Sequence, residues 1–133
     1  MEDLVQEIKS FYPGDMVKYN EEAARVYGLL RESWECCVED DLLYSVVCRY
    51  RNSVQTLKLM EVGIEDSDIH LVNLHMSKAS TWMTGHDKSK ALHHDRPAPD
   101  ELLVDIKALQ VFSKQVIDRR TPTNERRKKQ LKP

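Results

Sequence analysis

The sequence is poor in the residues that make tight turns, with four glycines and five prolines among 133 positions. An all-β sandwich or barrel needs a turn about every 8–12 residues, so this scarcity argues against that fold class. The chain also lacks any apolar run approaching the roughly 20 residues that cross a bilayer. Its first ten residues, MEDLVQEIKS, lack the basic start and apolar stretch of a secretory signal. We therefore expect a helical protein of the nucleus or cytoplasm that does not enter a membrane.

Cysteine is also scarce, and its arrangement does not suit a disulfide framework. The three cysteines are Cys36, Cys37 and Cys48, an odd number with two adjacent members. This pattern predicts free thiols in a reducing compartment. Glu35 and Glu39 flank the adjacent pair, and negative neighbours make a thiol less reactive. We expect these cysteines to pack in the interior and not to act as nucleophiles.

The charge of the chain is divided between an acidic body and a basic end. Residues 119–133 hold seven of the 20 basic residues and a single acid, which gives them a net charge of +6. The other residues carry 13 basic and 21 acidic side chains, a net charge of −8. A basic segment of this kind calls for an acidic partner, such as nucleic acid, an import receptor, a lipid surface or the acidic body of another copy.

The basic residues of this segment are the candidate binding site: Arg119, Arg120, Arg126, Arg127, Lys128, Lys129 and Lys132. Several cations on an adaptable backbone suit phosphate recognition, and arginine offers two parallel donors. The segment has no aromatic residue for base stacking, so it predicts contacts to the backbone of nucleic acid, most simply RNA, without base specificity. A nuclear-import signal has the same composition, and a solubilising tail with no specific partner is a third interpretation.

Thr121 is a candidate phosphorylation site inside the basic segment, because Pro122 follows it. A phosphate there would add about −1.5 to −2 charge and offset up to two of the positive charges. Such a modification would weaken binding to an anionic partner. Thr-Pro pairs are also common in disordered tails that are not regulated.

Apolar residues recur at helical spacing in five stretches of the body. We predict a short helix in 2–12, ended by Pro13-Gly14, and a strong helix over 21–40 with Asn20 or Asp15 as a candidate N-cap. Further helices are predicted over 42–62, 69–83 and 100–118, although 44–48 and 70–74 also resemble strands. The helix over 42–62 would carry Arg49-Tyr50-Arg51, a basic and aromatic patch on its surface.

Five histidines lie in the middle of the chain, at positions 70, 75, 86, 93 and 94. His86-Asp87 and His93-His94-Asp95 have the residue types of a metal site. Their spacing matches neither a structural zinc site nor a His-Asp phosphohydrolase, so solvent-exposed histidines in a loop over 85–99 are the better interpretation. We predict no cofactor and no enzymatic activity.

Together these features predict an all-α protein. Residues 1–118 would form a small antiparallel bundle of four to five helices, and residues 119–133 a disordered basic tail. The predicted function is non-enzymatic binding of nucleic acid through the tail. The alternative is a protein-interaction adaptor or regulator whose tail is an import signal, a type common among viral accessory proteins. We expect Trp34 and Trp82 to anchor either the core or a contact between subunits. The sequence does not decide whether the protein forms a homodimer.

Overall fold

The computed structural model describes residues 1–83 and 94–131, and this part of the chain contains five α-helices and no strand. The α-helices are α1 (Glu2–Ile8), α2 (Met16–Cys37), α3 (Asp66–Trp82), α5 (Pro99–Asp118) and α6 (Arg120–Gln130). Three short turns of other helix types are η1 (Lys9–Phe11), the π-helical η2 (Val38–Leu42) and the 3₁₀-helical η3 (Thr56–Glu61). The predicted all-α class is confirmed. No helix within the described residues is both long enough and apolar enough to span a bilayer.

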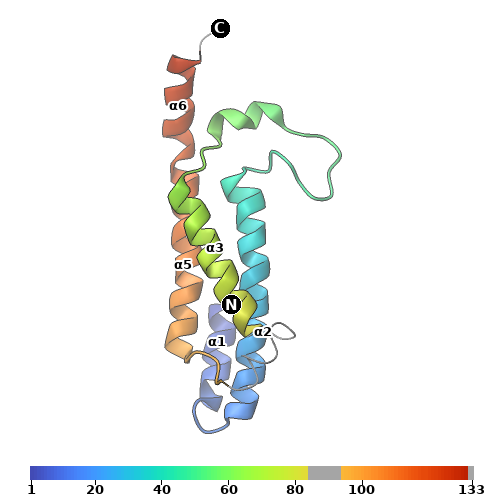
Figure 1. The fold of residues 1–133 in the computed structure, drawn as a ribbon, viewed down its shortest axis with the longest axis vertical. Helices are drawn as coiled ribbons and strands as arrows, with labels where there is room; N and C mark the ends of the chain where they lie inside the picture. The colour runs from blue at the N-terminus through green and yellow to red at the C-terminus, as the bar shows by residue number, and fades with distance from the viewer. Residues whose placement is uncertain (84–93, 132–133) are drawn as a thin grey trace.

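Four helices form an up-and-down bundle, in which α1, α2, α3 and α5 alternate in direction (Figure 1). Helix α2 packs against each of the other three helices, α1, α3 and α5. Helix α6 continues along the line of α5 and extends beyond the bundle, where it packs against η3. The molecule is therefore elongated, with η3 and α6 at the end opposite the turn that joins α1 to α2 (Figure 1).

Helix α2 forms where its apolar stripe predicted a helix, but it begins earlier than the candidate cap Asn20. The Asp15 side chain accepts a hydrogen bond from the Lys18 backbone N–H at 3.2 Å and so caps the helix. Asn20 instead contacts the segment before α5, through Asp95 at 3.0 Å and the Arg96 backbone N–H at 2.9 Å. Val38, at the end of the stripe, is only partly buried. The other residues of the stripe are buried as expected and form a large part of the core: Ala23, Val26, Tyr27, Leu30, Trp34 and Cys37.

Trp34 is fully buried in the core, which is one of the two roles predicted for it. Its ring stacks on His75 of α3 with centroids 4.9 Å apart and lies 5.3 Å from the ring of Phe112 on α5. Trp82 packs against the edge of the same core and is partly buried. This contact of three helices through one aromatic cluster accounts for the relative placement of α2, α3 and α5.

The predicted helices over 69–83 and 100–118 are also present, as α3 and α5. Helix α3 starts earlier than predicted, with a capping box in which the Glu65 and Asp68 side chains accept from each other's backbone N–H groups. Ile69 fits the apolar stripe of the helix predicted over 69–83, but it is half exposed. Helix α5 buries its stripe of Leu102, Ile106, Leu109, Phe112 and Val116.

The predicted helix over 42–62 is wrong. The chain leaves α2 through η2, and Tyr44 and Ser45 then take φ values of 51° and 53°, which an α-helix cannot accommodate. In the rest of this range only η3 is helical. Asn52, Ser53 and the β-branched valines are weak helix formers, and contacts with residues distant in the sequence hold the chain in a non-helical conformation. Residues 43–55 form an irregular loop.

The predicted disorder of the basic tail is also wrong, because residues 120–130 form α6. Pro122 explains why α5 and α6 are separate helices. Proline has no N–H to donate to the Asp118 carbonyl, and its ring would clash with that carbonyl, so the helix breaks at Arg119. The helical pattern resumes with the Thr123 N–H donating to the Arg119 carbonyl at 3.0 Å.

Candidate functional site

The surface that the sequence analysis singled out lies at the end of the molecule beyond the bundle. We call it the distal face and define it as residues 43–62, which contain the irregular loop and η3, together with α6. The seven predicted binding residues are on or beside this face, except that Lys132 lies outside the described residues. The structure divides the other six into two groups with different surroundings.

Arg119 belongs to the first group, whose members contact the protein itself. Its guanidinium makes ion pairs with Glu65 at 2.9 Å and with Asp68 at 2.8 Å. These are the two carboxylates of the α3 capping box, and Asp68 is buried. Burial opposes the charge on Arg119, but its hydrogen bonds and charge interactions with both acids leave its pKa raised. Arg119 therefore fastens the end of α5 to the start of α3.

Arg120 makes a similar contact with the end of α2 and η2. It donates to the backbone carbonyls of Asp40 at 3.2 Å and Asp41 at 2.9 Å, where the helix presents unpaired acceptors and the negative end of its dipole. The same guanidinium lies 4.0 Å from the centre of the Tyr44 ring, and the Lys58 ammonium lies 4.6 Å from that centre. Two cations thus contact the Tyr44 ring and stabilise the residue in its unusual backbone conformation.

Arg127 completes the first group. It donates to the carbonyl of Leu59 at 2.8 Å and to the carbonyl of Val62, both at the end of η3. Three of the predicted phosphate-binding arginines therefore hold helix ends together within the protein. The sequence could not show this, because the acceptors are mostly backbone carbonyls distant along the chain.

The second group comprises Arg126, Lys128 and Lys129, which are exposed on α6. Arg126 contacts only Gln130 of the same helix, at 3.3 Å, and Lys128 makes a long ion pair of 3.8 Å with Glu125, among the contacts that the structure gives for them. An exposed pair of this kind contributes little to stability. Thr121 is also exposed, in the first turn of α6. These side chains remain accessible to a partner.

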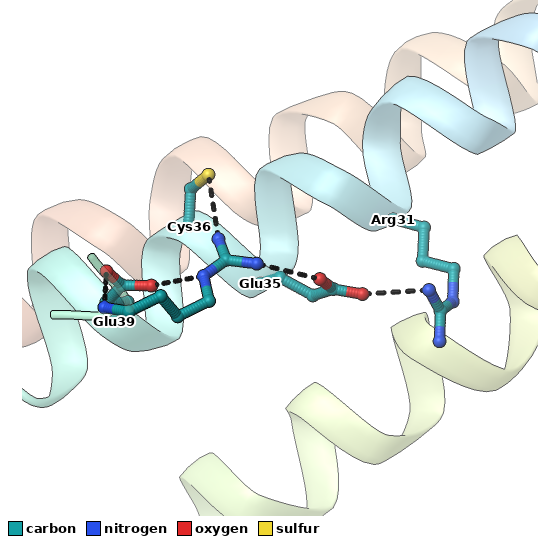
Figure 2. A network of polar contacts seen from close by, with 5 residues as sticks. Arg31, Glu35, Cys36 and Glu39 are labelled. Carbon is teal, nitrogen blue, oxygen red and sulfur yellow. Dashed lines mark hydrogen bonds and ion pairs between the residues drawn. The ribbon is translucent and has the colours of Figure 1, made fainter.

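Arg49 anchors the irregular loop to the end of α2 and to η2, through the labelled residues Glu35, Cys36 and Glu39 of Figure 2. Its side chain contacts Glu39 at 2.7 Å, Glu35 at 3.6 Å and the Cys36 sulfur at 3.9 Å, and its backbone N–H donates to Glu39 at 3.2 Å. Hydrogen bonds from the Arg49 backbone and side chain lower the pKa of Glu39. The sequence placed only acids beside Cys36, whereas folding adds this guanidinium.

Arg51 organises the interior of the same loop. Its guanidinium donates to the carbonyls of Ser45 and Ser53, and the Gln55 N–H donates to the Val46 carbonyl at 2.8 Å. Arg49 and Arg51 thus stabilise a loop conformation and do not form the predicted patch on a helix. Between them Tyr50 projects into solvent with 98% of its surface exposed, and Val47 and Val54 are more than half exposed.

A groove of about 540 Å³ separates η3 from α6. It is lined mainly by apolar side chains, together with the Arg127 side chain that joins its two walls: Thr56, Leu59, Met60, Val62, Arg127 and Leu131. Leu57 on η3 is 91% exposed, and Leu59 and Leu131 are each more than half exposed. The distal face therefore combines exposed aliphatic groups with the cations of α6.

A second groove, of about 700 Å³, lies between α2 and α5 and includes Cys37, Asp41 and Ser113 in its lining. The Ser113 hydroxyl donates to Asp41 at 2.7 Å. Burial, reinforced by Asp41, raises the pKa of the Cys37 thiol to about 12, so the thiol stays protonated at neutral pH. The expectation that Cys37 packs in the interior is confirmed, whereas Cys36 is exposed.

The histidines do not form a metal site within the part of the chain that the structure describes, where no group of three potential ligands occurs. His75 is stacked on Trp34, and burial lowers its pKa. His86, His93 and most of the predicted loop over 85–99 lie outside the described residues. Of that loop, Asp95 and Arg96 are seen to contact Asn20 of α2.

One buried polar cluster has no signal in the sequence, because its members come from three helices distant along the chain. Asp105 of α5 is buried. Its carboxylate accepts a hydrogen bond from the Tyr27 hydroxyl at 2.7 Å and forms an ion pair with Lys78 at 2.9 Å. Lys78 also pairs with the more exposed Glu101 at 2.9 Å. Burial and the bond to Asp105 raise the pKa of Tyr27. The cluster links α2, α3 and α5 and is satisfied internally, so we assign it a structural role.

No protein-family model matches this chain, and no curated protein or solved structure shows detectable similarity to it. The chemistry of the distal face is therefore the basis of the proposed function.

Proposed function

We propose that this protein is a non-enzymatic protein-interaction module that binds a partner through the distal face. The observation that supports this proposal is Tyr50, which is almost fully exposed on a loop held by hydrogen bonds from Arg49 and Arg51. A tyrosine supplies a large contact area with few rotatable bonds, and such residues are frequent energetic anchors in interfaces.

The order of this loop matters for the energetics of binding. A flexible loop would lose conformational entropy on docking, whereas a loop already held in one conformation loses less. The left-handed conformations of Tyr44 and Ser45 also cost free energy in the isolated protein. These two residues belong to the same loop as the exposed Tyr50, so their cost in free energy supports a role of the loop geometry in recognition.

Site-specific photo-crosslinking tests this proposal. A photoreactive phenylalanine analogue at position 50 should capture a discrete partner from cells of the source organism, and Leu57→Asp should abolish that capture. The control places the same analogue at Val17, which is 77% exposed at the start of α2, at the other end of the molecule. Equal capture from positions 50 and 17, or capture unaffected by Leu57→Asp, would contradict a docking role for the distal face.

Binding of nucleic acid through α6 is the second candidate, and the exposure of Arg126, Lys128 and Lys129 favours it. With Arg119, Arg120 and Arg127 occupied inside the protein, these three cations and Lys132 are what the basic segment offers to phosphates. Single-stranded RNA should then bind without base preference, with a log–log salt slope of about −2 to −3 for three to four contacts.

Replacement of Arg126, Lys128 and Lys129 by glutamine tests this candidate without removing the structural arginines. The matched control replaces Lys9, Lys107 and Lys114, which are exposed elsewhere. Retained RNA affinity in the first variant, measured by filter binding at low salt, would exclude α6 as the binding site. Removal of residues 119–133 is a poorer test, because it also deletes the three arginine contacts that hold the distal face together.

The same triple variant bears on nuclear import, which requires that a receptor bind these cations. An import signal in α6 predicts nuclear accumulation of a fluorescent fusion of the full chain and its loss in the Arg126, Lys128 and Lys129 variant. Unchanged localisation of that variant would leave α6 without an import role.

A further inference from the structure

We propose that the groove between η3 and α6 binds an acidic amphipathic helix of a partner protein. This inference rests on the proposed interaction function and names the class of partner. Two properties of the groove carry it: an apolar lining that needs cover and an excess of positive charge on one wall.

A polar contact between the two walls holds the groove open. Arg127 extends from α6 to the carbonyls of Leu59 and Val62, so the two walls are joined at a fixed separation by hydrogen bonds. Leu59, Met60, Val62 and Leu131 surround this contact. Because the groove exists before a ligand arrives, a partner does not have to open it, which favours affinity.

The charge of the groove comes from α6, which carries five basic residues and one acid between Arg120 and Gln130. Residues three or four apart are neighbours on a helix surface, and Lys128 of α6 is three residues before Leu131, which follows the helix and lines the groove. Lys58 is on η3, but its ammonium contacts the Tyr44 ring and does not line the groove, so among the described residues the positive charge comes from α6 alone. Acidic side chains flanking an apolar stripe complement this arrangement.

A helix is the form of partner that fits the dimensions. Helix α6 has 11 residues and a length of about 16 Å, which a partner helix of about three turns would match. Leucines at helical spacing can fill an apolar groove while glutamates between them face the cations, which is a common mode of helix recognition. Nucleic acid is a poorer occupant, because the groove lining contains no aromatic residue for base stacking.

Fluorescence anisotropy with a synthetic probe tests the inference on the full chain. The probe is a fluorescein-labelled peptide of about 16 residues with leucines at i, i+3, i+4 and i+7 and glutamates at most other positions. A second probe replaces every glutamate by lysine. We expect saturable binding of the acidic probe and at least about tenfold weaker binding of the basic one.

Two variants locate the probe on the protein. Leu131→Ser and Lys128→Glu should each weaken binding of the acidic probe about fivefold or more, by removing apolar contact and by reversing charge beside it. Lys107→Glu makes the same charge change on α5, outside the groove, and should alter affinity less than about twofold. Circular dichroism of each variant confirms that α6 is retained.

Three results would overturn the inference: no saturable binding of the acidic probe, equal binding of the basic probe, or equal effects of Lys128→Glu and Lys107→Glu. Displacement of the probe by oligothymidylate, with no effect of Leu131→Ser, would also overturn it and assign the surface to nucleic acid. A concentration-dependent dimer that Leu131→Ser dissociates would overturn it in favour of a second copy of this chain. If position 50 still captures a partner while the acidic probe fails to bind, the interaction function stands and only the groove assignment fails.

Discussion

The guanidinium of Arg120 lies 4.0 Å from the centre of the Tyr44 ring while donating hydrogen bonds to the carbonyls at the end of η2. This contact joins the last helix of the chain to the loop that follows α2. It also shows how a segment that is basic and polar by composition becomes ordered. Arg120 and Arg127 bind backbone carbonyls at the ends of η2 and η3, and Arg119, the N-cap of α6, binds the two carboxylates of the α3 capping box.

This relationship predicts a measurable coupling between the two residues. Tyr44→Ala should lower the free energy of unfolding by about 1–2 kcal/mol, because it removes the stacking contacts with Arg120 and Lys58. Tyr50→Ala is the matched control and should change stability by less than about 0.5 kcal/mol, since the Tyr50 side chain is almost fully exposed. A double-mutant cycle with Arg120→Ala that gives a coupling near zero would contradict the structural role of this pair.

The buried carboxylate of Asp105 provides a second prediction. Asp105→Ala should destabilise the protein by about 3 kcal/mol, because it leaves the Tyr27 hydroxyl and the Lys78 ammonium without their buried acceptor. Glu101→Ala removes the other partner of Lys78 but should cost less than about 1 kcal/mol, since Glu101 is half exposed. Chemical denaturation measures both, and equal losses would show that burial does not distinguish the two acids.

Acidification should weaken the core through His75. Burial lowers its pKa in the folded state below the ordinary value of 6.5, with Lys78 adding to the shift and Asp105 of α5 opposing it. The unfolded state therefore binds a proton more readily, so this contribution to stability is present above pH 6.5 and is lost as the pH falls below it. His75→Phe keeps a ring against Trp34 but cannot titrate. Thermal melts between neutral and mildly acidic pH should show a shallower decline for this variant, and an unchanged decline would assign the titration to other groups.

The loop that carries Tyr50 should depend on Arg49 for its order. Arg49→Gln removes the ion pairs with Glu35 and Glu39, so backbone amides of residues 43–55 should exchange with solvent faster while those of α2 keep their protection. Because Arg49 lowers the pKa of Glu39, acidification through that lowered pKa should loosen the loop in the same way. Arg25→Gln breaks an exposed pair with Glu22 elsewhere on α2 and serves as the control. Exchange of the loop at the wild-type rate in the Arg49 variant would show that other contacts hold it.

Local pattern was sufficient for the bundle. Apolar residues at helical spacing in 21–40, 69–83 and 100–118 predicted helices that form, and the same spacing identified the buried positions of α2 and α5. It was insufficient over 42–62, where Tyr50, Val54 and Leu57 also fit one helical face but are exposed on a loop and a 3₁₀ turn. A stripe produces a buried helix only where another element covers it, and here the chain turns away from the bundle at Tyr44.

The sequence by itself determined the all-α class, the place of Trp34 on the apolar face of α2 and the concentration of positive charge at the end of the chain, since each follows from spacing or composition. Only the tertiary structure decided what that charge does. Arg119, Arg120 and Arg127 find their acceptors on α3, η2 and η3, and most of these acceptors are backbone carbonyls that become available when other helices end. Because every residue carries such a carbonyl, no pattern of side chains can show in advance which of them an arginine will bind.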